Sequence, residues 1–318
     1  MESGGGDEQN GKGPLLISPH LLVKGACIAA AVVAAGTALA KLMMSPKLPI
    51  HKRWSCEESI RVILIRHGES ENNRMAYDGV DDFHAKRKAD PSLTARGQKQ
   101  AEALGRWIEM DDAAEYRPLH ALWVSPCLRT LMTAFPIAKA LRVSPEVVTD
   151  IYEAGGLYVG RGGEGVGGLS RSEMQKAFPG YRVPSDVTEH GWYERAGLVV
   201  GKEDRSVSRT RAKNVVKRIV RMAKDLKNTA TSTCDVEDGM SSSPPMRRIA
   251  LVIHGDFIND LLTEFLHTRV SKAMFDHHNT GLTVLDVFAD GETRMLAYNS
   301  VEHLRPEKLC LNEALGRI

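Results

Sequence analysis

A short apolar run that ends in a charged cluster constrains this chain more than any other feature of its sequence. Val62-Ile63-Leu64-Ile65 is uninterrupted and rich in β-branched residues, which is typical of a strand buried on both faces. Arg66-His67-Gly68-Glu69 follows it directly. Ligands of open α/β sheets bind at the carboxyl ends of strands. The sequence therefore predicts a site where a cation, a potential nucleophile and a tight turn meet.

Two further strand-like runs end in residues of the same kind. Residues 120–124 precede Ser125-Pro126, and Arg129 lies one turn into the helix that Pro126 can begin. Residues 248–253 end in His254-Gly255-Asp256. The N-terminal end of a helix favours anions. Each motif alone could be structural, but three strand ends that carry Arg-His, Arg and His are hard to explain by packing.

These residue types suit phosphoryl transfer through a histidine. A neutral imidazole nitrogen of His67 can attack phosphorus while a hydrogen bond holds the other ring nitrogen. Arg66 offers a bidentate fork to phosphoryl oxygens, and Asn73 offers a further donor. The alternative is structural: a strand that ends in a basic turn, with His67 merely hydrogen-bonded.

The motifs, taken in order, resemble those of the histidine phosphatase superfamily, also called phosphoglycerate-mutase-like. The resemblance runs from about Arg61 to about Leu304. The family patterns RHG(E/Q) with a later Asn, L(S/T)xxGxxQA, SPxxRxxxTA and HG(D/G/H) stand here at residues 66–73, 93–101, 125–134 and 254–256. Four motifs in family order are specific for the superfamily, but they do not indicate the substrate.

The resemblance implies roles for five residues. It implies His67 as the nucleophile and Arg66, Arg129 and His254 as the phosphate pocket, with Asn73 beside it. His254 is also counted among the catalytic residues.

The proton donor is expected to be a carboxylate, because the leaving alkoxide needs an acid and the second step needs a base. In the family a glutamate after the third strand does this, and here Glu153 follows a strand-like run over residues 146–152. A neighbouring phosphate dianion should raise its pKa. Two alternatives stay open: Glu153 is an exposed loop carboxylate, or Asp256 is the donor. Glu69 is interpreted as a residue that orients the nucleophile.

Residues 155–195 form a glycine-rich segment that is predicted to be a lid carrying substrate specificity. It lacks the Gly-Lys-Ser/Thr ending of a P-loop. Arg161, Trp192 and Arg195 are candidate substrate contacts, and a purely structural cap explains them equally well.

Strands that alternate with helices favour an α/β fold, specifically a three-layer α/β/α sandwich with a mostly parallel central sheet. Thr94 is the expected N-cap of a helix to about residue 110, and Pro136 should kink or split a second helix that ends near Leu141. Further helices are expected at 208–227 and 260–266, and strands at 283–288 and 293–298.

Composition excludes several classes of function. The chain has 318 residues, and its net charge of +2 is too small for a nucleic-acid surface. Five widely spaced cysteines give neither a disulfide framework nor a zinc pattern. No metal or cofactor is expected, because the arginines supply the charge that a cation would otherwise neutralise. The oligomeric state is not indicated.

The N-terminal region is expected to be separate from the catalytic domain. Residues 1–20 are interpreted as a disordered tail, 21–44 as an apolar transmembrane anchor whose lysines snorkel, and 45–58 as a linker. Lysines after the anchor favour a cytosolic catalytic domain. The alternatives are a signal peptide cleaved near residue 40, giving a secreted or organellar protein, and an organelle-targeting or alanine-rich amphipathic segment.

The sequence also predicts the bounds of the catalytic domain and its activity. The phosphatase domain is expected over residues 59–308, with a flexible insertion at 227–246 and a tail at 309–318. The predicted function is metal-independent hydrolysis of a small phosphorylated substrate or a phosphoprotein through phospho-His67. The alternatives are a phosphoglycerate mutase and a non-catalytic scaffold that binds phosphorylated partners at a membrane.

Overall fold

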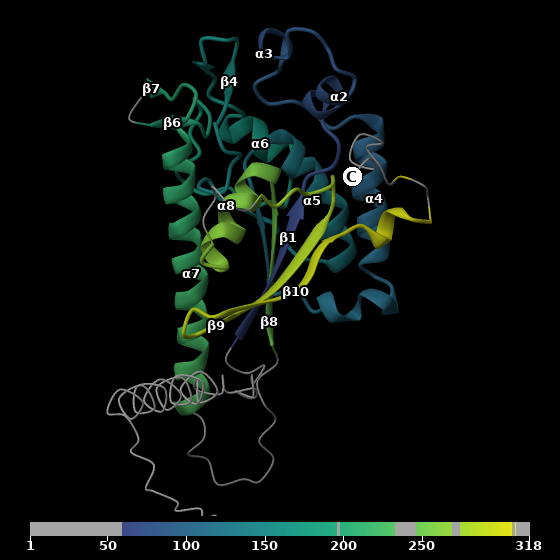
Figure 1. Ribbon diagram of the computed structural model, residues 1–318, viewed down its shortest axis with the longest axis vertical. Coiled ribbons are helices and arrows are strands. Elements are labelled where there is room, and N and C mark those ends of the chain that lie inside the picture. The colour runs from purple at the N-terminus through teal and green to yellow at the C-terminus, as the bar shows by residue number, and fades with distance from the viewer. Residues whose placement is uncertain (1–58, 196–197, 233–245, 269–273, 307–308, 310–318) are drawn as a thin grey trace, which may run out of the picture. The chain divides into compact units, whose positions relative to one another are not determined.

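The computed structural model describes residues 59–195, 198–232, 246–268, 274–306 and 309. Its centre is a sheet with the strand order β10-β9-β1-β8-β2-β3 (Figure 1). The strands β1, β8, β2 and β3 are parallel, and β9 is antiparallel to both of its neighbours. The bounds are β1 Ser59–Arg66, β2 Ala121–Val124, β3 Glu146–Val147, β8 Arg247–Ile253, β9 Leu282–Phe288 and β10 Thr293–Ser300.

The two central strands bring the histidine motifs together. β1 and β8 pair in parallel with Arg66 opposite Ile253, so both strands end at the same edge of the sheet. The backbone N–H of His67 donates to the carbonyl of Ile253 at 2.9 Å. The register of two apolar strands therefore places His67 beside His254 although 187 residues separate them (254 − 67).

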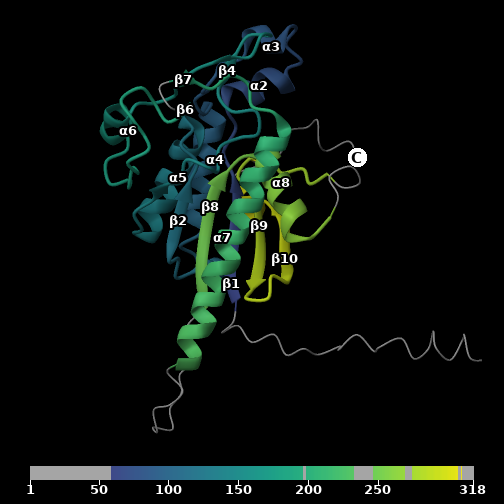
Figure 2. The same ribbon diagram turned by 90° about the vertical axis from the view of Figure 1, so that its left-hand side faces the viewer.

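Helices cover both faces of this sheet (Figure 2). Ile63 of β1 belongs to one apolar cluster, which includes helix residues Leu104 and Leu131. Leu64, which points to the other face, belongs to a second cluster, which includes Leu261. The helices are α4 (Ala95–Trp107) and α5 (Leu128–Leu141) on the first face, and α7 (Arg205–Ser232) and α8 (Gly255–Phe265) on the second.

This arrangement confirms the predicted α/β fold with helices on both sides of a mostly parallel sheet. The N-cap prediction is also confirmed, because the Thr94 hydroxyl accepts the N–H of Gly97 at 3.1 Å where α4 begins. The expected split of the second helix is wrong, since α5 runs through Pro136 without interruption. A Cβ on Gly105 of α4 would lie 2.9 Å from the Cβ of Pro136, so the two helices approach closely there and their packing supports α5.

The third strand is shorter than predicted. Only Glu146–Val147 pair with β2, and one further backbone bond joins the N–H of Val148 to the carbonyl of Val124 at 2.9 Å. The outer edge is covered by the chain around Arg182, whose carbonyl accepts the N–H of Val147 at 3.0 Å. Beyond Val148 the chain leaves the sheet and reaches Glu153 as a loop.

Short elements gather beyond the carboxyl edge of the sheet, where β1 ends (Figure 1). They come from two insertions, one after β1 and one between β3 and α7. They are α2 (Glu71–Tyr77), α3 (Phe83–Lys86), β4 (Tyr158–Val159), β5 (Glu164–Gly165), α6 (Arg171–Ala177), β6 (Glu194–Arg195) and β7 (Leu198–Val199). Two 3-10 helices, η2 (Asp111–Tyr116) and η3 (Glu302–Leu304), lie elsewhere in the chain.

The predicted membrane localisation is corrected. No helix among the residues that the structure describes is both long and apolar enough to cross a bilayer. The longest of them, α7, has 28 residues but carries charged side chains along much of its length. The segment 21–44, on which the prediction depended, lies outside the described residues. Helix α7 also continues to Ser232, into the segment predicted as a flexible insertion.

Candidate active site

The imidazole of His67 is fixed in a single useful orientation. It lies directly after β1 and is 3% exposed. Its Nδ1 is 2.7 Å from the carbonyl of Gly68, an acceptor only, so Nδ1 carries the proton. Its Nε2 then holds a lone pair, toward which Nε of Arg129 donates at 3.2 Å. Burial and the charges of Arg129 and Arg66 lower the pKa of His67 well below its ordinary value, so the ring is neutral at pH 7.

Arg129 lies in the first turn of α5 and faces His67. It is 8% exposed, and its Nη1 lies 3.7 Å from Oδ1 of Asp90. The same carboxylate accepts the N–H of Leu128 at 3.0 Å and so caps α5. Burial raises the pKa of Asp90 to about 6 despite the arginine. Asp90 therefore holds both the helix end and the guanidinium, and the sequence analysis did not single it out.

Arg66 lines a cavity of about 660 Å³ together with Asn73 and Glu153. Its Nη1 donates to the carbonyl of His277, which fixes the guanidinium. Its Nε is buried and has no hydrogen-bond partner in the described structure. An arginine that one hydrogen bond fixes in place, and whose Nε–H has no partner, is suited to bind an anion.

His254 begins helix α8 and is fully buried. Its Nε2 lies 2.7 Å from Oγ of Ser125, whose hydroxyl rotates freely enough to donate. Its Nδ1 is buried and without a partner among the described residues. The ring centroids of His254 and His67 are 5.3 Å apart. Burial and the charge of Arg129 lower the pKa of His254, so a neutral ring would present Nδ1–H as an unused donor.

Glu153 reaches the same cavity from the loop after β3. Its Oε1 accepts the N–H of Ala154 at 2.9 Å and that of Phe257, in the first turn of α8, at 3.1 Å. Burial, followed by the charge of Asp256, raises the pKa of Glu153 to about 7. Desolvation thus outweighs the two hydrogen bonds, which favour the ionised form. A carboxyl group of this kind can both give and take a proton near neutral pH.

Asp256, the alternative proton donor, has a different environment. Its side chain is 70% exposed and lies 3.7 Å from Nη1 of Arg205. Asp256 therefore lacks the burial that distinguishes Glu153. Asp256 lines the cavity, but its surroundings suit an acid less than those of Glu153 do.

Asn73 stands at the start of α2, and its oxygen is fully used. Oδ1 accepts from the backbone N–H of Ser70 at 3.1 Å and from Nδ2 of Asn279 at 3.3 Å. The Nδ2 group of Asn73 is therefore the end that can serve the cavity it lines. Asn279 also donates to the carbonyl of His67 at 3.0 Å, so it supports both residues from the loop before β9.

Two of the three lid candidates, Arg161 and Trp192, are not among the described residues that line this cavity. Arg161 is exposed and pairs with Asp82 at 2.8 Å. Trp192 is 5% exposed and packs against Tyr152 and Tyr193 in the apolar core. Arg195 lies in β6, and its side chain is outside the described atoms. The structure therefore brings together Arg66, His67, Asn73, Arg129, Glu153 and His254, but it does not bring Arg161 or Trp192 to them.

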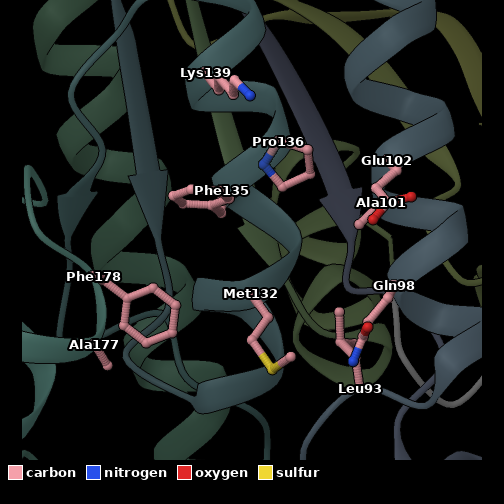
Figure 3. Close-up of a pocket in the computed structure, with 10 residues that line it drawn as sticks. All are labelled: Leu93, Gln98, Ala101, Glu102, Met132, Phe135, Pro136, Lys139, Ala177 and Phe178. Atoms are coloured by element: carbon pink, nitrogen blue, oxygen red, sulfur yellow. The ribbon is translucent and has the colours of Figure 1, made fainter.

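A second cavity of about 540 Å³ lies between α4 and α5 (Figure 3). It is lined mainly by apolar side chains, such as Met132, Phe135 and Phe178, with Lys139 and Glu102 at its border. It contains none of the candidate site residues. Among the described residues, no group of three or more His, Cys, Asp or Glu side chains is placed to hold a metal ion.

Comparison with known families identifies the family of this chain. The family described as "Histidine phosphatase superfamily (branch 1)" matches residues 62–301, more than half of the chain. The chain belongs to the histidine phosphatase superfamily. The resemblance inferred from the four motifs is thereby confirmed. None of the curated proteins compared with this chain matches it.

Solved structures of phosphatases are similar to it at low identity. A mycobacterial glucosyl-3-phosphoglycerate phosphatase is 19% identical with a TM-score of 0.46, and the match covers 76% of this chain and 99% of that one. A phosphoserine phosphatase from Entamoeba histolytica is 18% identical with a TM-score of 0.42, covering 77% and 99%. A putative alpha-ribazole-5'-P phosphatase from Escherichia coli is 16% identical with a TM-score of 0.46, covering 76% and 97%.

Several residues that support this site were not predicted from the sequence. Asn279 and His277 come from the loop before β9, and no strand-end motif marks that loop. Ser125 was quoted only as part of a motif, yet it sets the ring of His254. Its position directly after β2, which pairs in parallel with the strand that ends before His254, was the available signal.

Proposed function

We propose that this histidine phosphatase hydrolyses phosphomonoesters through a phosphohistidine formed on Nε2 of His67. The observation that carries the proposal is the 2.7 Å contact between Nδ1 and the carbonyl of Gly68. Because that carbonyl can only accept, the proton is held at Nδ1 and the lone pair lies on Nε2, which makes Nε2 the nitrogen that attacks phosphorus. The neutral state of the buried ring supports the same reading.

In the first step, the Nε2 lone pair of His67 forms a bond to phosphorus as the bond to the ester oxygen breaks. Glu153 gives its proton to the departing oxygen, which leaves as an alcohol. The phosphoryl oxygens would lie against Arg66, Arg129 and Nδ1–H of His254. These donors are fixed before the substrate arrives, which is the arrangement that stabilises developing charge most effectively.

In the second step, the ionised Glu153 takes a proton from water, and the water oxygen attacks phosphorus. The phosphorus–nitrogen bond breaks, its electron pair returns to His67, and inorganic phosphate leaves. One carboxyl group must therefore alternate between acid and base, and a pKa of about 7 suits both roles at neutral pH. The side chain of Asp256 is 70% exposed and lacks the burial of Glu153.

The test is to trap the intermediate. Wild-type protein and His67→Ala are mixed with ³²P-labelled phenyl phosphate in the presence of a chelator, quenched in base, and analysed for acid-labile phosphate on protein. We expect label on wild type, none on the variant, and loss of turnover in the variant. Turnover by wild type without labelled protein would refute the covalent mechanism.

The same assay separates the two alternatives retained from the sequence. A mutase would be labelled by a phosphorylated primer and pass the phosphoryl group to an acceptor instead of to water. A scaffold would bind phosphorylated ligands but release no inorganic phosphate, even with His67 intact.

A further inference from the structure

Two cations lie on one aromatic ring close to the proposed active site. The guanidinium carbon of Arg87 is 3.7 Å from the ring centroid of Tyr158, and Nζ of Lys202 is 5.3 Å from the same centroid. Arg87 follows α3 directly, and Lys202 lies between β7 and α7. Segments far apart in the sequence thus bring two positive side chains to a single point.

The chain connections show that this pair is near the phosphate-binding residues. Asp90, which contacts Arg129, comes three residues after Arg87 (90 − 87). Tyr158 comes five residues after Glu153 (158 − 153) on the same loop. The charges of Arg129 and Glu153 both act on the pKa of Arg87, which burial lowers. Arg87 is therefore a neighbour of the site and partly shielded from water.

Neither cation has a carboxylate partner among the described residues. Nη1 of Arg87 donates to the carbonyl of Tyr158, which fixes the side chain but does not neutralise it. Two other arginines near the site differ, because Arg161 pairs with Asp82 at 2.8 Å and Arg205 pairs with Asp260 at 2.9 Å. A held, partly desolvated and unneutralised arginine is the environment in which an anionic ligand binds well.

Two aspartates lie in the cavity of the site. Asp256 and Asp276 both line the cavity that contains Arg66 and Glu153, and Arg205, which lies 3.7 Å from Asp256, lines it too. Asp256 and Asp276 would disfavour a second negative group of a substrate beside them, whereas Arg87 and Lys202 would attract it. The charges therefore favour one orientation of such a substrate over its reverse.

We propose that Arg87 and Lys202 bind a second anionic group, a carboxylate or a second phosphate, on the substrate whose phosphoryl group is transferred to His67. The proposal rests on the phosphatase function above and narrows its substrate class. Tyr158 supports both cations by presenting its ring face to them.

The experiment uses matched aryl phosphates that differ in one group. The full chain is assayed with phenyl phosphate, with 3- and 4-carboxyphenyl phosphate, with 1,4-phenylene bisphosphate, and with 4-(aminomethyl)phenyl phosphate. We expect kcat/KM for at least one anionic substrate to exceed that for phenyl phosphate by roughly tenfold or more, the value of one charge-assisted hydrogen bond. The cationic substrate should fall below phenyl phosphate. The carboxylate and bisphosphate arms identify which anion is preferred.

Substitutions then assign the preference to residues. Arg87→Met and Lys202→Met should each reduce the ratio of anionic to neutral kcat/KM, and Arg87→Glu should invert it toward the aminomethyl substrate. Arg161→Gln removes an exposed arginine whose charge is already neutralised, and it should leave the ratio unchanged.

The outcomes separate this inference from the proposed function. No hydrolysis of any substrate by folded wild type would overturn the function itself. Hydrolysis with equal kcat/KM for neutral and anionic substrates, or a ratio that Arg87→Glu does not change, would overturn only the anion site.

Discussion

Replacement of Glu153 by Gln should weaken catalysis and strengthen the fold at the same time. Gln keeps an oxygen that can accept the N–H groups of Ala154 and Phe257, but it cannot titrate. The folded-state pKa of Glu153 is about 7, against an ordinary value of 4.5. At 1.36 kcal/mol for each unit, the difference of about 2.5 corresponds to roughly 3 kcal/mol.

Proton binding to Glu153 determines whether this group raises or lowers the free energy of unfolding at a given pH. Between pH 4.5 and about 7 the folded protein holds a proton on Glu153 that the unfolded chain has released, so this group costs stability as the pH rises. The full cost of about 3 kcal/mol is present above pH 7 and is nearly absent below 4.5. We therefore expect Glu153→Gln to raise the free energy of unfolding by about 3 kcal/mol at pH 8 and by less than about 1 kcal/mol at pH 5.

Activity should change in the opposite direction. Loss of the general acid should reduce kcat/KM for an alkyl phosphate by about 10² to 10⁴. The loss should be smaller for 4-nitrophenyl phosphate, whose leaving oxygen needs no proton. The wild-type rate should decline as the pH rises through about 7, because the acid form of Glu153 is lost. Taking the ratio of wild type to variant cancels the titration of the substrate's own phosphate.

Urea unfolding at pH 5, 6.5 and 8 gives the stability arm, and initial rates over the same range give the activity arm. Glu102→Gln on α4 is the matched control, since this carboxylate is exposed and does not line the cavity of Glu153. A stability difference that does not depend on pH would refute the argument from burial. An unchanged break near pH 7 in the variant would show that another group is the acid.

Three further predictions test the site and the core. Gly97→Ala would place a Cβ 2.1 Å from the carbonyl oxygen of Glu69, so we expect the free energy of unfolding of this variant to fall by more than about 2 kcal/mol in urea titrations. Gly162→Ala adds a Cβ in open space, and its free energy of unfolding should stay within about 0.5 kcal/mol of wild type. Ser125→Ala removes the partner that sets the ring of His254, so kcat should fall by roughly tenfold with little change in Tm; an unaltered kcat would show that the hydroxyl does not matter. Leu261→Ala empties a fully buried position of α8 and should cost about 2–5 kcal/mol in chemical denaturation, a cost that a value near zero would contradict.

The strand ends could be read from the sequence because their signal is local. A buried apolar run followed by Arg66-His67 specifies both a strand and the chemistry at its end, and the same holds for His254. Parallel pairing of the two runs then brings the histidines to one edge, so no distant information was needed. The α/β fold was predictable for the same reason.

The errors arose where tertiary contacts decide. Trp192 lies in a glycine-rich segment and was predicted as a candidate substrate contact, but it packs against Tyr152 and Tyr193 in the apolar core. Pro136 normally interrupts a helix, but the small Gly105 lets α4 pack against it. Arg87 belongs to no recognisable motif, and its position near the site follows only from its contact with Tyr158 of the other insertion.

The loop before β9 supports both His67 and Arg66, although it carries none of the sequence motifs. Asn279 holds the carbonyl of His67, the backbone of Thr280 and Gly281 pairs with Arg66, and His277 anchors the Arg66 side chain. A fragment that stops after α8 would keep every recognisable motif yet lose the backing of its nucleophile. Annotation by motif alone would score such a truncated gene product as intact, although the His67 carbonyl and the Arg66 side chain would lose these partners.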